Sequence, residues 1–131
     1  MTRDIIEVQY PALDNTESVA NVLITKKTVV PANGITLKEA FSNKNNSLFI
    51  IVDTSAATAT SSTMTLKKGD AYPNSMLGDL KITLSKGISA IQIQDLSRFE
   101  KADGSIDIDF PTDFSGDIYA VAKWAGVREV D

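Results

Sequence analysis

The sequence predicts a mainly β protein, either an antiparallel β-sandwich or a small barrel, with one short α-helix and an extended N-terminal arm. Short segments rich in β-branched residues follow one another at a spacing of roughly 10 to 15 residues. Clusters of Gly, Pro, Asn and Asp separate these segments, as they do at turns between strands. No long helical pattern alternates with the strands, which argues against a parallel βαβ sheet. The 131 residues, 43% of them hydrophobic, suit one domain with its own core.

The first 18 residues predict an extended arm, because apolar and polar residues mix there without a period and Pro11 interrupts them. We expect the arm over residues 1–18, the β domain over 19–124 and a C-terminal tail over 125–131. An arm outside the core is available to a partner. Its apolar residues are therefore the candidate partner-binding residues, namely Ile5, Ile6, Val8 and Tyr10. On this interpretation, deletion of residues 1–12 leaves the core folded.

The next segments predict a strand, a turn and the helix. Residues 19–30 are rich in β-branched residues and favour a strand that is broken near Lys26. The Pro-Ala-Asn-Gly sequence at 31–34 is typical of a turn. Thr36 and Glu39 have the spacing of a helix capping box, which predicts a short helix over about 36–43.

The middle of the chain predicts strands around a mobile loop. Residues 48–52 form the longest apolar run and indicate a strand that is buried on both faces. Residues 54–63 contain only Ala, Ser and Thr, so we expect a loop without an anchoring side chain. Strands with one apolar face follow at 64–66, 80–84 and 88–93.

The strictest alternation in the chain lies at 106–110. It places Ile106, Ile108 and Phe110 toward the core and Asp107 and Asp109 toward solvent. Residues 118–124 then predict the last strand.

Composition excludes several classes of function. The chain has no His and no Cys, which removes Ser-His-Asp and Cys-His catalysis and the usual structural zinc sites. A net charge of −4 is the wrong sign for a surface that neutralises phosphates, so we expect no nucleic-acid partner. No apolar run approaches the roughly 20 residues of a membrane-spanning helix, so we expect no membrane partner.

Carboxylates are the main remaining chemical groups. Residues 103–109 hold three Asp residues within seven positions, which a Ca²⁺ site could use, but the pattern differs from an EF-hand loop. A turn at Asp103 that leads into a strand is the simpler interpretation. Glu100 and Asp103 do not lie in the apolar sequence context that a general acid requires. We therefore expect no enzyme activity, no cofactor and no metal.

Several motifs resemble the small capsid decoration proteins of tailed bacteriophages. The order is Met64-Thr65-Leu66-Lys67-Lys68-Gly69-Asp70, then Leu77-Gly78-Asp79-Leu80, then Ser97-Arg98-Phe99-Glu100-Lys101-Ala102-Asp103-Gly104-Ser105-Ile106, then a last strand introduced by Gly. Upstream, Gly34-Ile35 followed by Leu37-Lys38-Glu39-Ala40 is similar to their N-terminal half. Together these motifs cover roughly residues 30–124.

The resemblance implies a structural virion protein on the capsid surface, made in the cytoplasm of a host bacterium. Its partner would be the lattice of the major capsid protein, which it would stabilise by bridging subunits. Whether the protein forms a homo-oligomer stays open. Two alternatives also stay open: a structural component of the phage tail or neck, and a carbohydrate-binding β-sandwich module.

Overall fold

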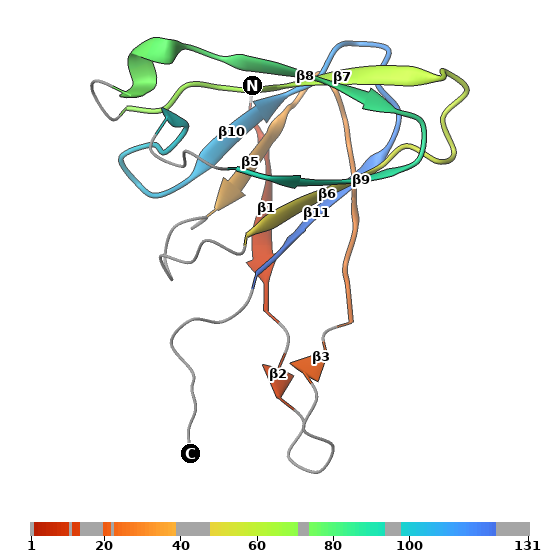
Figure 1. Cartoon of the computed structure of the whole chain (residues 1–131), viewed down its shortest axis with the longest axis horizontal. Coiled ribbons are helices and arrows are strands. Elements are labelled where there is room, and N and C mark those ends of the chain that lie inside the picture. The colour runs from red at the N-terminus through yellow and green to blue at the C-terminus, as the bar shows by residue number, and fades with distance from the viewer. Residues whose placement is uncertain are drawn as a thin grey trace.

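A computed structural model of the chain describes residues 2–10, 12–13, 20–21, 23–38, 48–70, 74–93 and 98–122. Within these residues the secondary structure is almost entirely β, and η1 is a short 3-10 helix (Figure 1). The elements in chain order are β1 (Asp4–Gln9), β2 (Ala12–Leu13), β3 (Ala20–Asn21), β4 (Lys27–Thr28), β5 (Ile35–Lys38), β6 (Phe49–Asp53), β7 (Ser61–Leu66), η1 (Asn74–Leu77), β8 (Leu80–Ser85), β9 (Ile88–Gln92), β10 (Ile106–Asp109) and β11 (Asp117–Val121). The mainly β fold class is therefore confirmed.

One large sheet contains all of these strands except β2 and β3, which pair with each other. Its order is β8-β7-β10-β5-β1-β11-β6-β9, and β4 pairs with β11 beside β1. The two edge strands, β8 and β9, are consecutive in the chain and only Lys86 and Gly87 separate them. The sheet must therefore curl until its two edges meet at this turn, which makes it a nearly closed, barrel-like sheet (Figure 1). Of the two expected architectures, the barrel describes the molecule better than the sandwich.

The buried Thr54 forms hydrogen bonds to the turn at which the two edges meet. Thr54 is only 2% exposed, and its N–H donates to the Gly87 carbonyl at 2.8 Å. Its hydroxyl also bonds Gly87, donating to the carbonyl and accepting from the N–H, each at 3.1 Å. Gly87 has a φ of 135°, which other residues rarely adopt, so glycine allows the chain to turn here from β8 into β9.

The core lies inside the curled sheet and follows the expected alternation. Ile106 and Ile108 of β10 are fully buried and Phe110 is 8% exposed, so the predicted inward face of this strand is confirmed. Fully buried residues on neighbouring strands complete the core, including Ile35, Leu37, Ile50, Val52, Met64, Ile118 and Ala120. Each fully buried aliphatic side chain contributes roughly 1.5–3 kcal/mol relative to exposure, so this interior dominates the stability.

The expected N-terminal arm is wrong for residues 4–9. These residues form β1 in the middle of the sheet, parallel to β5 on one side and to β11 on the other. The partner strands β5 and β11 lie far along the chain from β1. No turn in the local sequence therefore predicts that these strands pair. Deletion of residues 1–12 would therefore remove a central strand, which contradicts the expectation that the core survives it.

The predicted helix over 36–43 is wrong where the structure describes it. Ile35–Lys38 is strand β5, and residues 39–43 lie outside the described residues. Ile35 and Leu37 are fully buried between β1 and β10. The Thr36 hydroxyl donates to the Asp107 carboxylate at 2.8 Å and caps no helix, so the capping-box spacing was coincidental.

Three smaller expectations also change. Among the described residues of the predicted strand at 19–30, the strand segments are β3 and β4, of two residues each. The predicted strand at 48–52 exists as β6, but only one of its faces is fully buried, since Phe49 is 37% exposed. The loop predicted over 54–63 is anchored by the buried Thr54 and Ala57, and its last residues begin β7 at Ser61. The predicted tail at 125–131 lies outside the described residues.

Candidate functional site

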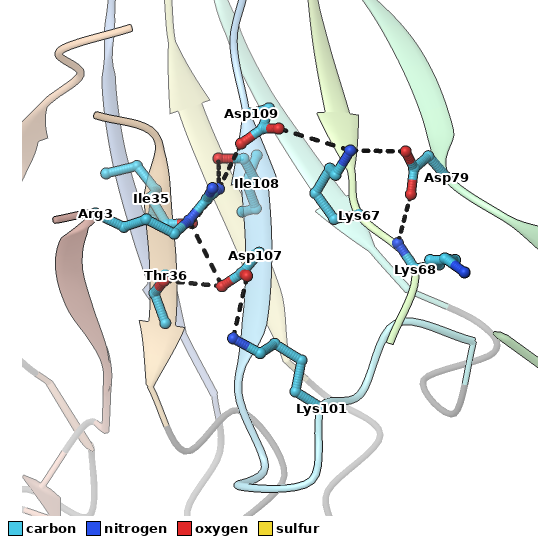
Figure 2. A network of polar contacts seen from close by, with 10 residues as sticks. All are labelled: Arg3, Ile35, Thr36, Lys67, Lys68, Asp79, Lys101, Asp107, Ile108 and Asp109. Atoms are coloured by element: carbon cyan, nitrogen blue, oxygen red, sulfur yellow. Dashed lines mark hydrogen bonds and ion pairs between the residues drawn. The ribbon is translucent and has the colours of Figure 1, made fainter. Parts of the chain in front are cut away.

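A network of charged side chains covers the outer face of the sheet where β5, β10 and β7 lie side by side (Figure 2). Arg3, just before β1, reaches across β5 to β10. Its Nη2 donates to the Ile108 carbonyl at 2.8 Å, to the Ile35 carbonyl at 3.3 Å and to the Asp109 carboxylate. The Arg3 guanidinium therefore links the N-terminal end of β1 to the neighbouring strands β5 and β10.

The two outward carboxylates of β10 are both engaged by cations. Lys101 Nζ donates to Asp107 Oδ2 at 3.1 Å, while Asp107 Oδ1 accepts from the Thr36 hydroxyl. Arg3 Nε lies 3.7 Å from Asp107 Oδ1, which is an ion-pair distance but too long for a hydrogen bond. Asp109 Oδ2 lies 3.7 Å from Lys67 Nζ.

Lys67 extends the network to the loop before β8. Its Nζ donates to Asp79 Oδ2 at 2.8 Å, and the backbone N–H of Lys68 donates to Asp79 Oδ1 at 2.7 Å (Figure 2). These two bonds, from the Lys67 ammonium first and the Lys68 amide second, lower the pKa of Asp79 below its ordinary value. The same hydrogen bond to Asp79 raises the pKa of Lys67.

The charges within this network balance. Three cations, from Arg3, Lys67 and Lys101, face three carboxylates, from Asp79, Asp107 and Asp109. Every carboxylate has a cation or a protein donor within reach, so none is left as a free base or metal ligand. Across the described residues, no group of three or more acidic side chains is arranged to hold a metal ion. The arrangement can clamp strands together.

The carboxylates that the sequence grouped at 103–109 are separated by the fold. Asp103 accepts hydrogen bonds from the N–H and the hydroxyl of Ser105 at 3.1 and 2.6 Å, which closes a turn. These two bonds lower the pKa of Asp103. Asp107 and Asp109 point instead into the charged network. The turn that the sequence favoured at Asp103 is therefore present, and its carboxylate is used within the turn.

A cleft of about 410 Å³ opens on the other side of β1, between β1 and β4. It is lined by apolar, polar and charged residues, namely Ile5, Ile6, Glu7, Gln9, Thr25, Lys26, Lys27 and Tyr119. Its volume lies within the range of about 300–1,000 Å³ that is common for ligand sites. We call it the β1–β4 cleft.

The four candidate partner-binding residues have different environments. Ile5 lines the β1–β4 cleft and is 61% exposed. Ile6 is 9% exposed within the core, and Val8 and Tyr10 are partly buried against it. Ile5 is thus the one of the four that offers a largely exposed side chain to another molecule.

Sequence reasoning missed a second exposed apolar surface. Met76 and Leu77 of η1 and Leu80 of β8 are 68%, 64% and 38% exposed, and we call these three residues the η1–β8 patch. Arg98 holds the segment between them, because its guanidinium donates to the carbonyls of Leu77, Gly78 and Asp79 at 3.0 to 3.3 Å. The resemblance used Leu77 and Leu80 as motif residues, but no periodicity in the sequence marks them as exposed.

The segment that carries Arg98 packs closely against the end of β7. Gly69 donates to the Arg98 carbonyl at 2.9 Å, and a Cβ added to Gly69 would lie 2.0 Å from the Glu100 carbonyl oxygen. Only glycine allows this approach, so the Gly69-Asp70 pair serves a packing contact as well as a turn. The backbone of the η1–β8 patch is therefore hydrogen-bonded to Arg98, and the Arg98 backbone is bonded in turn to the end of β7.

Comparison with known protein families, with curated proteins and with solved structures finds no match to this chain. Among the described residues, no helix has the length and apolar character needed to cross a membrane.

Proposed function

We propose that this protein is a structural virion component that binds the outside of an assembled phage capsid and stabilises it by bridging capsid subunits. The motifs over residues 30–124 resemble those of capsid decoration proteins, and we infer from this resemblance that the partner is a capsid. The η1–β8 patch supports a binding function, because three large apolar side chains lie exposed within five positions of the chain and grouped exposed apolar side chains often mark an interaction site.

The charged network and the η1–β8 patch together favour a binding role over a catalytic one. Its carboxylates are paired with cations on a rigid β face, so their charge stabilises the fold. The apolar side chains of Met76 and Leu77, in contrast, make the surface that stands free of the core. The observation that carries the proposal is therefore this exposed apolar patch, whose backbone Arg98 holds by hydrogen bonds.

The small size of the η1–β8 patch favours an assembled capsid lattice as the partner over a single capsid subunit. Three side chains bury little area, so a single contact of this size is weak. Many copies on one capsid stabilise it together, and a docking surface built from two neighbouring subunits supplies more contact than one subunit can. We therefore expect an assembled capsid to bind the protein well and an isolated capsid subunit to bind it poorly.

The test is co-sedimentation with mature capsids at low and high salt. We expect the intact protein to pellet with capsids at both salt concentrations, because the contact is mainly apolar. A Met76→Ser, Leu77→Ser double variant should lose most of this binding while its melting temperature stays unchanged. Leu23→Ser is the matched control, since Leu23 is 92% exposed and lies outside the patch. Equal binding by the double variant would remove the patch from the proposal.

A tail or neck component is the second candidate, favoured by the two free edges of the sheet. Within the part of the chain that the structure describes, β8 pairs with β7 alone and β9 with β6 alone. Away from the Lys86-Gly87 turn, each of these edges could therefore accept a strand from a neighbour in a ring. Binding of the intact protein to empty tails, with no binding to capsids, would transfer the assignment to this candidate.

A carbohydrate-binding module receives less support. Such sites stack sugars on exposed aromatic rings, and Phe49, at 37%, is the one aromatic among the most exposed large apolar side chains of the described residues.

A further inference from the structure

The β1–β4 cleft arises because β1 and β4 share one edge of β11. β4 pairs with the start of β11, through Asp117↔Thr28 and Ile118↔Lys27. β1 pairs only with its end, through Val8↔Ala120 and Gln9↔Val121. The first half of β1 therefore diverges from β11, and the cleft opens between it and β4.

Backbone groups of β1 point into this cleft. The Asp4 N–H donates to the Gly34 carbonyl beside β5, whereas the Gln9 carbonyl accepts from the Ala122 N–H beside β11. Alternate residues of a strand direct their backbone N–H and C=O groups to opposite sides. The backbone groups of Ile5 and Glu7 therefore point toward the cleft. The ladder to β11 begins only at Val8, so the N–H and C=O of Ile5 and the N–H of Glu7 have no backbone partner within the described residues.

A side chain of the protein already shows that an amide fits between the two walls. The Gln9 carboxamide donates to the Thr25 carbonyl and accepts from the Thr25 N–H, both at 2.9 Å. It therefore bonds residue 25 as the peptide unit of a neighbouring strand would. At the other end of the cleft, Lys27 Nζ lies 3.9 Å from Asp4 Oδ2. These contacts tie the two walls together at both ends of the cleft and fix their spacing, which lowers the ordering cost of binding.

The charge around the cleft indicates the chemistry of an occupant. Lys26 and Lys27 are opposed by Glu7 in the lining and by Asp4, Asp53 and Asp117, which pair with the lysines. Lys38, which lies in register with Glu7 on β5, adds a third cation, so three cations against four carboxylates leave a net charge of −1. Among the described residues Glu7 has no ion-pair partner, and the exposed Ile5 side chain lies beside it.

We propose that the β1–β4 cleft binds an extended segment of a partner protein that carries a basic side chain next to an apolar one. The segment pairs with the backbone of Ile5 and Glu7, in the manner of strand addition. Its apolar side chain packs on Ile5 and Tyr119, and its basic side chain approaches Glu7. This binding site is separate from the η1–β8 patch, and its test contains no capsid, so the two proposals can fail independently.

The first measurement is amide hydrogen exchange in the free protein. The Ile6 amide, which faces β5, should exchange slowly, and the Ile5 amide should exchange quickly although it lies in a central strand. Equally slow exchange at both positions would mean that the Ile5 amide is already bonded, and would overturn the proposal.

The second measurement is a nitrogen-15 NMR titration with a blocked peptide of sequence Thr-Val-Arg-Val-Thr. We expect saturable shifts at the Ile5 and Glu7 amides and slower exchange at Ile5. The matched peptide with Glu in place of Arg should bind about tenfold more weakly, since the cleft is negative. Glu7→Gln should weaken the Arg peptide about fivefold and leave the melting temperature unchanged.

Three results would overturn the proposal. The first is the absence of shifts at Ile5 and Glu7 at millimolar peptide. The second is equal binding of the Arg and Glu peptides. The third is a concentration-dependent shift of the same amides without peptide, which would make a second copy of this chain the occupant.

Discussion

The two edges of β1 differ in how completely they are paired. Toward β5, four consecutive residues form a parallel ladder, from Asp4↔Ile35 to Glu7↔Lys38, and Arg3 extends the contact to β10. Toward β11, the ladder contains only Val8 and Gln9, and a cleft replaces the rest. One edge of the strand, the closed edge, therefore joins the sheet along four residues, while the other, open edge leaves backbone groups of Ile5 and Glu7 without a ladder partner, as the proposed peptide site requires.

The charged groups on the two sides differ in the same way. On the closed side, three cations and three carboxylates neutralise one another over β5, β10 and β7 (Figure 2). Around the cleft, carboxylates outnumber cations and Glu7 stays unpaired within the described residues. A balanced network suits a structural role, while an uncompensated one can select a partner by charge.

The largest effect should follow from deleting residues 1–9, which removes β1. Without it, β5 loses its ladder to β1 and the short contact from β1 to β11 disappears as well, so among the described residues no ladder between strands joins the two halves of the sheet. We expect loss of cooperative thermal unfolding by circular dichroism. A truncated protein that melts as the wild type does would restore the interpretation of these residues as a dispensable arm.

The next effect separates the two faces of β1. Ile6→Ala should lower the free energy of unfolding by about 2–4 kcal/mol, because the side chain packs in the core. Ile5→Ala, the matched control, should change it by no more than about 0.5 kcal/mol, since Ile5 is largely exposed. Urea denaturation measures both. Similar losses at the two positions would show that the outer face of β1 is also packed.

Arg3→Ala tests the clamp on the closed edge. We expect a loss of about 1–2 kcal/mol in the free energy of unfolding, because the guanidinium bonds two carbonyls and a carboxylate at a partly exposed site. Arg3→Lys should recover less than half of this, since an ammonium cannot reproduce the forked geometry. Full recovery by lysine would mean that only the charge of residue 3 is needed.

The smallest effect concerns Asp79 and its pH dependence. Its pKa is lowered in the folded state by Lys67 and Lys68, so its contribution is complete above the unfolded pKa of about 3.9 and is lost as pH falls through the folded pKa. The partner Lys67 has a raised pKa, so the contribution also fades as pH rises above about 10.4.

Asp79→Asn should therefore cost up to about 1 kcal/mol of unfolding free energy between pH 5 and 9, which is a value for an exposed pair. The difference from wild type should shrink below about pH 4. Urea titrations at several pH values measure it. A difference that is constant down to pH 2 would show that the carboxylate acts through shape rather than charge.

The fold class and the faces of several strands could be predicted because they depend on local pattern. The alternation at 106–110 placed Ile106 and Ile108 in the core and Asp107 and Asp109 outside, and the structure agrees. The Thr36 and Glu39 spacing misled for a physical reason: the burial of Ile35 and Leu37 between two strands outweighs the modest stability of a helix cap.

The candidate site could be predicted only in part. Ile5 was named from its sequence, but as part of an arm, whereas it lies on the edge of a central strand. The cleft depends on the registers of β1 and β4 along β11, and the network depends on Arg3 reaching residues 108 and 109. Contacts between positions so far apart in the chain leave no periodic signal.

By itself, the sequence determined a β-rich chain without His or Cys, with a net charge of −4 and with core residues at alternate positions of its strands. Side-chain chemistry and a two-residue period suffice for these properties. Tertiary structure alone decided that the N-terminal residues form the central strand, that the sheet curls until β8 and β9 meet, and that one edge of β1 stays open. These features depend on which strands pair, and pairing is selected by the burial of the whole core rather than by any one segment.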